Sequence, residues 1–152
     1  MSQKSYNEQP TLYLIPTPIG NMEDLTMRTI HTLQLVDVIF SEDTRVTGQL
    51  LKQLEIKKPL LANHEHKEKE NGNKLLKFLS EGKNVGLVSD RGTPIISDPG
   101  YYLSTVAIEN GYNVVSLPGA TALIPALTSS GLNPSPFLFY GFLSSKEGKR
   151  KK

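Results

Sequence analysis

The chain has 152 residues, no cysteine and a formal net charge of +2 at pH 7. This length is typical of one domain with a full hydrophobic core, and the lack of cysteine excludes disulfide bonds and cysteine-ligated metals. Five of the 17 basic residues lie in the last seven positions, which leaves 12 basic and 14 acidic residues elsewhere. The charge of this larger part therefore gives no reason to expect a polyanion-binding domain. We interpret residues 144–152 as a basic tail, either a solvated end or an arm for nucleic acid.

The first ten residues are polar, and we expect residues 1–10 to be a disordered extension. They contain no apolar segment of the kind found in signal peptides. No apolar run in the sequence approaches the ~20 residues that a membrane-spanning helix needs. We therefore expect a cytoplasmic protein that has no membrane partner.

Short apolar runs alternate with segments of helical periodicity along the chain. This alternation predicts an α/β fold over residues 11–143, with a mostly parallel open sheet flanked by helices. Asp24 or Thr26 is suited to cap the first helix, and Gly82 to end the third. In chain order, strands are predicted at 12–15, 38–40, 60–62, 85–88, 114–117 and 137–142, and helices at 22–36, 46–54, 68–79, 101–109 and 121–128.

The last predicted strand, 137–142, is the most apolar and aromatic segment of the chain. It is followed almost at once by the charged tail. We expect it either to pair at an edge of the sheet or to lead toward a further part of the protein.

Five predicted strands end in loops that are rich in glycine, proline and small polar residues. Each loop alone could be only a turn, because Gly, Pro, Asn and Asp favour turns for backbone reasons. All five would lie at the carboxyl edge of a parallel sheet, where ligands bind in such folds. Glycine lets the backbone of residues 89–94 approach a ligand closely, so we expect this loop to form the floor of a binding cleft. The five loops are 16–21, 41–45, 63–66, 89–94 and 118–121.

Several common catalytic motifs are absent. Neither a Walker sequence nor a Gly-x-Gly-x-x-Gly fingerprint is present, which argues against an ordinary NTPase or dehydrogenase. No Gly-x-Ser-x-Gly sequence supports a serine nucleophile. Asp43, His64 and His66 are possible metal ligands, but their spacing fits no known motif, and we predict no metal site.

Six short motifs occur here in the order in which one family carries them. Through them the chain resembles ribosomal RNA small subunit methyltransferase I, a member of the tetrapyrrole methylase superfamily, from about residue 12 to residue 143. The motifs are Pro-Thr-Pro-Ile-Gly-Asn at 16–21, Glu-Asp-Thr-Arg at 42–45, His-Glu-His at 64–66, Ser-Asp-x-Gly-Thr-Pro at 89–94, Ser-Asp-Pro-Gly at 97–100 and Leu-Pro-Gly at 117–119.

The resemblance implies two α/β domains with S-adenosylmethionine in the cleft between them, in a protein that is usually a homodimer. It implies methyl transfer to the ribose 2′-hydroxyl of a cytidine in 16S ribosomal RNA, within the 30S subunit. This chain corresponds to the N-terminal domain, so we expect the 152 residues alone to have weak or no activity. Two alternatives stay open: a non-catalytic remnant that binds RNA or a partner, and an unrelated nucleotide-binding protein.

The resemblance also implies which residues hold the cofactor, and these lie in three of the five loops. One position departs from the family, since Arg91 stands where alanine is usual. Arg91 could block the cofactor, point into solvent or face an RNA phosphate. The expected cofactor-binding residues are Pro16, Thr17, Pro18, Gly20, Ser89, Asp90, Gly92, Thr93, Pro94, Pro118, Gly119, Ala120 and Thr121.

A ribose hydroxyl is a poor nucleophile until its proton begins to leave, so a nearby base helps the transfer. The candidates at the expected edge are Glu42, Asp43 and His64. Arg45 is suited to bind a phosphate with two hydrogen bonds, and we expect Arg45 and Arg91 to contact RNA. The alternative for Asp43 is a structural one, as a cap of the following helix or a partner of Arg45 in a local ion pair.

Overall fold

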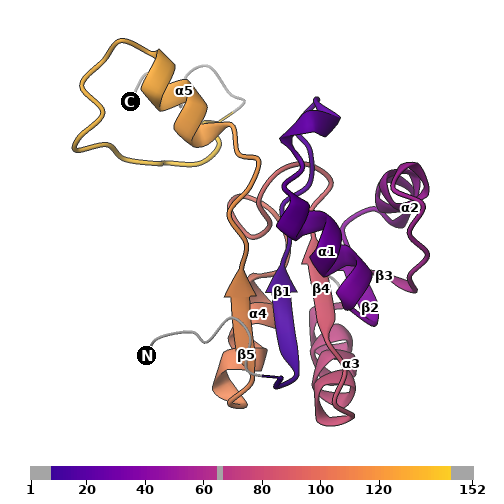
Figure 1. The fold of residues 1–152 in the computed structure, drawn as a ribbon. Coiled ribbons are helices and arrows are strands. Elements are labelled where there is room, and N and C mark those ends of the chain that lie inside the picture. Colours follow the sequence, from indigo (N-terminus) through magenta and orange to yellow (C-terminus); the bar gives the residue numbers. More distant parts are fainter. Residues whose placement is uncertain (1–7, 65–66, 145–152) are drawn as a thin grey trace. The chain divides into compact units, whose positions relative to one another are not determined.

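Residues 8–64 and 67–144 are described by a computed structural model of the chain (Figure 1). The chain divides into two compact units, residues 1–121 and 122–152. Most of the expected disordered start and of the expected basic tail lies outside the described residues, as does His66. Among the described residues, no helix has both the length and the apolar character needed to cross a membrane.

The first unit is built on five strands that pair in parallel in the order β3-β2-β4-β1-β5 (Figure 1). The predicted parallel α/β sheet is therefore confirmed. β3 and β4 match their predicted ranges, β2 is one residue longer, and β1 and β5 each begin and end one residue earlier than predicted. The strands are β1 (Thr11–Leu14), β2 (Val38–Ser41), β3 (Leu60–Ala62), β4 (Val85–Val88) and β5 (Asn113–Ser116).

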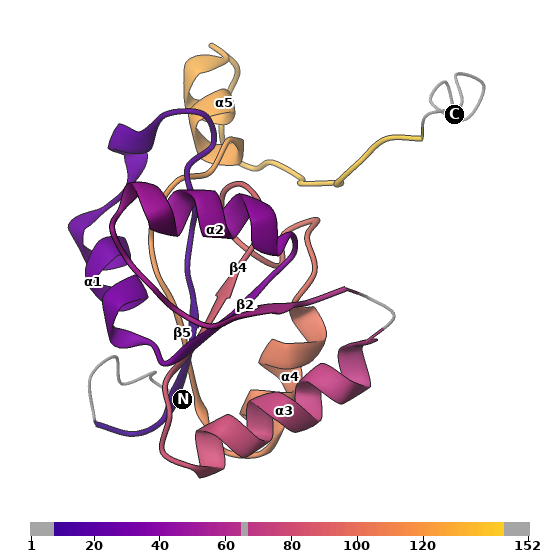
Figure 2. The same cartoon turned by 90° about the vertical axis from the view of Figure 1, so that its right-hand side faces the viewer.

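Two helices cover each face of the sheet, with α1 and α2 on one side and α3 and α4 on the other (Figure 2). The chain runs toward one edge from β1 through β2 to β3 and then back through β4 to β5. Right-handed crossovers place helices on opposite faces when the direction reverses, which explains this arrangement. The helices are α1 (Met27–Leu35), α2 (Thr44–Gln53), α3 (Glu68–Ser80) and α4 (Tyr101–Glu109).

The first predicted helix, 22–36, is divided in the structure. A 3₁₀ turn, η1, covers Met22–Asp24, and α1 begins only at Met27. Thr26 has extended backbone dihedral angles, and its side chain accepts a hydrogen bond from the amide of Thr29. Of the two residues expected to cap this helix, Thr26 is the one that does so, because a cap must lie outside the helical backbone.

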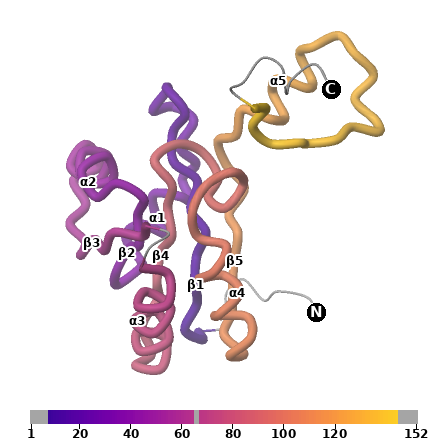
Figure 3. The backbone as a smooth tube through the Cα atoms, turned by 180° about the vertical axis from the view of Figure 1, so that it is seen from behind, coloured from indigo at the N-terminus to yellow at the C-terminus, as the bar shows by residue number. Residues whose placement is uncertain are grey.

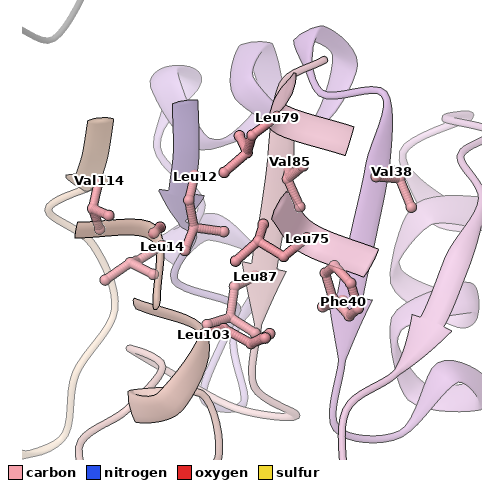
Figure 4. Close-up of a cluster of buried hydrophobic side chains, with 11 residues drawn as sticks. Leu12, Leu14, Val38, Phe40, Leu75, Leu79, Val85, Leu87, Leu103 and Val114 are labelled. Atoms are coloured by element: carbon pink, nitrogen blue, oxygen red, sulfur yellow. The ribbon is translucent and has the colours of Figure 1, made fainter. Parts of the chain in front are cut away.

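Successive side chains of each strand enter different cores. Leu12 and Leu14 pack under α3 and α4 with Phe40 and Leu87, in the cluster that Figure 4 shows. Tyr13 and Ile15, whose side chains point to the other face of the sheet, pack under α1 and α2. Because a parallel sheet is covered on both faces, its strands are apolar at nearly every position, as the sequence pattern indicated.

Within residues 122–144, the described part of the second unit, there is one helix, α5 (Leu123–Ser129), followed by a segment without regular secondary structure. The prediction of a strand at 137–142 is wrong, because this segment pairs with no strand of the described residues. A strand needs a neighbour for its backbone N–H and C=O groups, and a run of apolar side chains cannot supply one. The side chains of this segment are exposed, with Phe142 at 86%.

Candidate functional site

The loops after β1 and β4 are joined to each other at the carboxyl edge of the sheet (Figure 3). The amide of Thr17 donates to the carbonyl of Gly92, and the amide of Gly92 donates to the carbonyl of Thr17, both at 3.0 Å. The Thr17 hydroxyl also donates to the carbonyl of Ser89 at 3.1 Å. We call residues 89–94 the central loop, because the loops of two further strands also bond to it.

The loop after β2 contacts the central loop through Asp90. The Asp43 amide donates to Asp90 Oδ1 at 2.9 Å, and the Asp90 amide donates to Glu42 Oε2 at 3.3 Å. The loop after β5 is reached from Thr93, whose hydroxyl donates to the carbonyl of Ala120 at 3.2 Å. The structure therefore brings together the loops of β1, β2, β4 and β5, as expected from their positions at strand ends.

Close backbone packing holds these loops in place. A Cβ atom at Gly119 would lie 2.8 Å from Cβ and Cγ of Pro16, so the loops after β1 and β5 approach as closely as glycine allows. Gly92 has φ +78°, and a Cβ there would lie 3.2 Å from Ile19 and 3.5 Å from the Ala120 carbonyl oxygen. A side chain at either glycine would disturb contacts between loops.

β4 lies between β2 and β1 in the sheet, and its crossover leaves on the opposite face from theirs. The chain leaves β1 and β2 toward the α1 and α2 face, whereas it leaves β4 toward the face covered by α3 and α4. Ligands of open parallel sheets bind in the crevice at such a switch point, beyond the carboxyl ends of the strands. The central loop follows β4 and so lies at this crevice.

A cavity of about 740 Å³ opens at this edge on the α3 and α4 side, and we call it the Glu42 cavity. Two of the expected catalytic residues, Glu42 and His64, line it together, while Asp43 is not among its lining residues. Lys67 and Ile95 belong to none of the six sequence motifs, and Asp98 belongs to the Ser-Asp-Pro-Gly motif, for which no role was predicted. The lining residues are Glu42, His64, Lys67, Ile95, Ser97, Asp98 and Pro99.

Burial and neighbouring carboxylates raise the pKa values of two carboxyl groups in the Glu42 cavity. Burial raises the pKa of Glu42, and the charges of Asp90, Asp98 and Asp43 raise it further against the opposing hydrogen bond from the Asp90 amide. Burial also raises the pKa of Asp98, with a smaller contribution from Asp90 and an opposing hydrogen bond from Ser89. When ionised, Glu42 and Asp98 give the lining of this cavity two negative charges, and Lys67 gives it one positive charge.

Asp43 takes the structural role that the sequence offered as an alternative. Its Oδ1 accepts from the Arg45 amide at 2.8 Å and so caps α2, and its carboxylate pairs with the Arg45 guanidinium at 2.6 Å. The hydrogen bonds from the Arg45 side chain and amide lower the pKa of Asp43 to about 2. A carboxylate this acidic is a weak proton acceptor.

The segment after the central loop is strained. Ile95 has φ +81° and Ser97 has φ +61°, and both line the Glu42 cavity. A β-branched residue such as Ile95 adopts this region only under constraint from its surroundings. Asp98 and Pro99, which follow directly, also line the cavity.

A second pocket of about 210 Å³ lies on the α2 side of the same edge, and we call it the α2 pocket. It contains Arg91, which is exposed and does not line the Glu42 cavity. Expected cofactor residues of the loop after β1 and of the start of the central loop line this pocket, whereas Thr93 and residues 118–121 line neither cavity. The lining residues are Thr17, Pro18, Gly20, Met22, Val46, Thr47, Gln49, Leu50, Gln53, Ser89, Asp90 and Arg91.

Metal ligands do not gather at this edge within the described ranges. No three His, Asp or Glu side chains among residues 8–64 and 67–144 are close enough to share a metal ion. His66, one of the three side chains considered from the sequence, lies outside these ranges.

Solved structures of other proteins share the fold of this chain. The chain superposes on a uroporphyrin-III-C-methyltransferase from Thermus thermophilus with a TM-score of 0.59 and 23% identity, covering 82% of this chain and 54% of that one. A putative cobalamin synthesis related protein from Corynebacterium diphtheriae gives a TM-score of 0.60 and 19% identity, with 80% and 58% covered. At these identities the likeness shows a shared fold.

Comparison of sequences identifies the family. The sequence profile of the tetrapyrrole (corrin/porphyrin) methylases matches residues 11–151. The chain is 48% identical to ribosomal RNA small subunit methyltransferase I of Bacillus subtilis and 48% identical to that of Escherichia coli O157:H7. These matches cover 100% and 98% of this chain but 52% of each relative, so the chain spans about half their length. The resemblance found in the sequence motifs is confirmed, and the chain belongs to the tetrapyrrole methylase family.

Proposed function

We propose that this chain forms the cofactor-binding half of an S-adenosylmethionine-dependent methyltransferase. The substrate is small-subunit ribosomal RNA, and the acceptor is the ribose 2′-hydroxyl of a cytidine. The names of its relatives support the reaction class and the RNA. The cytidine and the 2′-hydroxyl follow from the resemblance of the six sequence motifs, and we expect the reaction to occur in the cytoplasm.

One observation carries the proposal: the central loop bonds to the loops of three other strands at the switch point of the sheet. Thr17, Glu42 and Ala120 each come from a different loop, and each accepts or donates a hydrogen bond to residues 89–94. A site assembled from four loops on a rigid sheet can hold a ligand and its reacting partner in a fixed geometry.

The residues at this edge fit S-adenosylmethionine, which when bound supplies a methyl group on a positively charged sulfur. Glu42, Asp90 and Asp98 give the edge a negative potential, which is complementary to that cation. The hydroxyls of Thr93 and Thr121 and the backbone of residues 118–121 offer hydrogen bonds beside it. We therefore propose the cofactor site between the central loop and the loop after β5.

The chain's own contribution to the chemistry is to position the ribose and to accept its proton. Glu42 lines the large cavity, is held by the Asp90 amide, and has a raised pKa that brings it closer to neutral pH. A base with such a pKa accepts a proton more readily than an ordinary glutamate. His64 lines the same cavity and is the second candidate.

The reaction is tested by incubating the purified chain with tritiated S-adenosylmethionine and small ribosomal subunits that lack the modification. Because the chain spans about half of its relatives, we expect slow transfer, and the assay scores where the label lies rather than the rate. We expect the label on the 2′-oxygen of a cytidine. Label on a base, or label on another RNA with equal yield, would contradict the proposal.

Glu42→Gln tests the role of the base. The amide keeps an acceptor for the Asp90 N–H but cannot take the ribose proton, so we expect transfer to fall roughly a hundredfold or more. In the wild type, transfer should decline as the pH falls through the raised pKa of Glu42. The matched control is Glu109→Gln at the exposed end of α4, which should leave transfer unchanged.

The alternative of a non-catalytic remnant predicts a different set of results. Such a chain would bind RNA or a partner without binding S-adenosylmethionine and would transfer no label with either glutamate in place.

A further inference from the structure

We propose that the α2 pocket binds the base of the target cytidine, with the cofactor site on the other side of the Thr17–Gly92 pair. This inference rests on the proposed function and assigns the substrate side of the same edge.

The size of the α2 pocket suits one base. Its volume of about 210 Å³ is below the ~300–1,000 Å³ of pockets that enclose drug-sized ligands, so it is small for a whole nucleotide or for S-adenosylmethionine. Met22, Val46 and Leu50 give it an apolar surface on which a flat ring can lie. Enzymes that do chemistry on a base hold it outside the stack in pockets of this kind, between apolar side chains and polar groups at the ring edge, and we extend this geometry to a nucleotide that reacts at its ribose.

A buried hydroxyl in the pocket wall lacks a partner. Thr47 is 2% exposed, and its Oγ1 has no hydrogen-bond partner among the described residues. Burying an unpaired hydroxyl is unfavourable, so such a group calls for an explanation. A ligand with a polar edge in the α2 pocket would supply the missing partner after a small adjustment of the side chain.

The polar groups around the pocket match the edge of cytosine. Cytosine presents an exocyclic amino group as a donor and N3 and O2 as acceptors. The carboxylate of Asp90 can accept from the amino group, and the amides of Gln49 and Gln53 can donate to the ring acceptors. Uracil places a carbonyl oxygen where cytosine has the amino group, which would face the Asp90 carboxylate unfavourably.

The charges on this side suit the RNA backbone. Helix α2 carries Lys52 and Arg45, the latter exposed and paired with the cap residue Asp43, and Arg91 lies at the pocket. Basic side chains around a base pocket bind phosphates and fix the strand without reading its sequence. We therefore expect Arg91, which stands where alanine is usual in the family, to contact a phosphate and not to block the cofactor.

Asp90 connects this pocket to the proposed base. Asp90 lines the α2 pocket, while its amide donates to Glu42 Oε2 at 3.3 Å in the neighbouring cavity. A cytidine whose base contacts Asp90 therefore has its ribose next to the residue that we propose as proton acceptor.

The test is an NMR titration of the ¹⁵N-labelled 152-residue chain with cytidine 5′-monophosphate and, separately, uridine 5′-monophosphate. We expect saturable shifts of the Thr47, Gln49 and Gln53 resonances, with cytidine bound about tenfold more tightly than uridine. Leu50→Trp should weaken cytidine binding about tenfold or more by filling the pocket. The control Ile108→Trp, an exposed position on α4, should leave it unchanged.

Two further variants separate base recognition from phosphate binding. Asp90→Asn keeps an acceptor for the Asp43 amide but turns a carboxylate oxygen into a donor, so we expect the preference for cytidine over uridine to be lost. Arg91→Ala should weaken both nucleotides by the same factor. Shifts confined to residues of the Glu42 cavity, no saturable shifts at millimolar nucleotide, or an unchanged preference in Asp90→Asn would overturn the inference.

A titration with S-adenosylmethionine keeps the two proposals distinguishable. If Leu50→Trp abolishes binding of S-adenosylmethionine, the pocket holds the cofactor and the present inference fails while the proposed function stands. If the wild type binds cytidine 5′-monophosphate in the α2 pocket but does not bind S-adenosylmethionine, the inference stands and the proposed function fails.

Discussion

The two units of the chain use similar apolar side chains in opposite ways. In residues 11–121 the strands find parallel neighbours and helices cover both faces, so that Phe40 is 0% exposed. In residues 122–144 the segment 137–142 has no strand partner among the described residues, and its Phe142 is 86% exposed. Backbone pairing and coverage, rather than apolar content, decide which segment becomes core. We therefore expect stability to be concentrated in the first unit and to depend little on the second.

Replacement of the two phenylalanines gives the largest contrast. Phe40→Ala removes a fully buried ring from the cluster in Figure 4 and should cost about 3–5 kcal/mol of unfolding free energy. Phe142→Ala should change it by less than about 0.5 kcal/mol, because its side chain is exposed. Urea unfolding followed by circular dichroism measures both. A cost of similar size at the two positions would break the comparison.

Two glycines with positive φ give the next contrast. Gly100 has φ +125°, and an added Cβ would lie 2.5 Å from Leu87 Cδ2 in the core. Gly131 has φ +73° with open space around it. We expect Gly100→Ala to cost about 2–3 kcal/mol, from backbone strain and displaced packing together, and Gly131→Ala about 1 kcal/mol or less. Thermal unfolding should show a clear loss for the first variant and at most a small one for the second.

Loss of the side-chain cap of α2 should have a smaller, pH-dependent effect on stability. Helix α5 has no such cap, because its cap residue Ala122 makes no side-chain hydrogen bond. Asp43→Ala removes both the cap and the pair with Arg45, whereas Asp43→Asn keeps a capping oxygen. We expect Tm at neutral pH to fall for alanine and to fall less for asparagine.

The pH dependence of this effect follows from the lowered pKa. Since the folded pKa of Asp43 is about 2 against an ordinary 3.8, its stabilisation is present above that range and is lost as the pH falls through it. The difference between wild type and Asp43→Asn should therefore shrink in acid. A Tm difference that stays constant down to acidic pH would show that the ion pair has no role.

The smallest expected effect on stability comes from Glu42→Gln. Burial and nearby carboxylates raise the pKa of Glu42, so ionisation of this group opposes folding once the pH rises above its unfolded value. The amide should therefore raise Tm by roughly 1–3 °C at neutral pH, and the gain should vanish in acid. A lower Tm at neutral pH would mean that the Glu42 carboxylate stabilises the fold, which would contradict this prediction.

The sequence pattern predicts this sheet well because most of its information is local. β4 and α4 begin and end where expected, since an apolar run bounded by Ser89 and a helix bounded by Asn110 are set by neighbouring residues. β2 extends one residue further than predicted, because Ser41 is buried and pairs like its apolar neighbours although it is polar.

What the sequence could not supply depends on contacts between distant residues. The pairing of Thr17 with Gly92 joins two loops that are 75 positions apart, and neither residue type indicates its partner. The same holds for Lys67 and Ile95 in the Glu42 cavity, whose side chains carry no motif of their own. The error at 137–142 has the same origin, because pairing depends on a second strand that the segment itself does not encode.

The central claim is that the loops around residues 89–94 bind S-adenosylmethionine, and a calorimetric titration of the folded chain tests it most directly. The glycines Gly92 and Gly111 form a matched pair, with φ +78° and +79°, but only a Cβ at Gly92 would meet neighbouring atoms. We predict saturable binding by the wild type, binding about tenfold weaker or lost in Gly92→Ala, and wild-type binding in Gly111→Ala. No saturable heat from a sample shown by circular dichroism to be folded, or equal affinity in both variants, would contradict the claim.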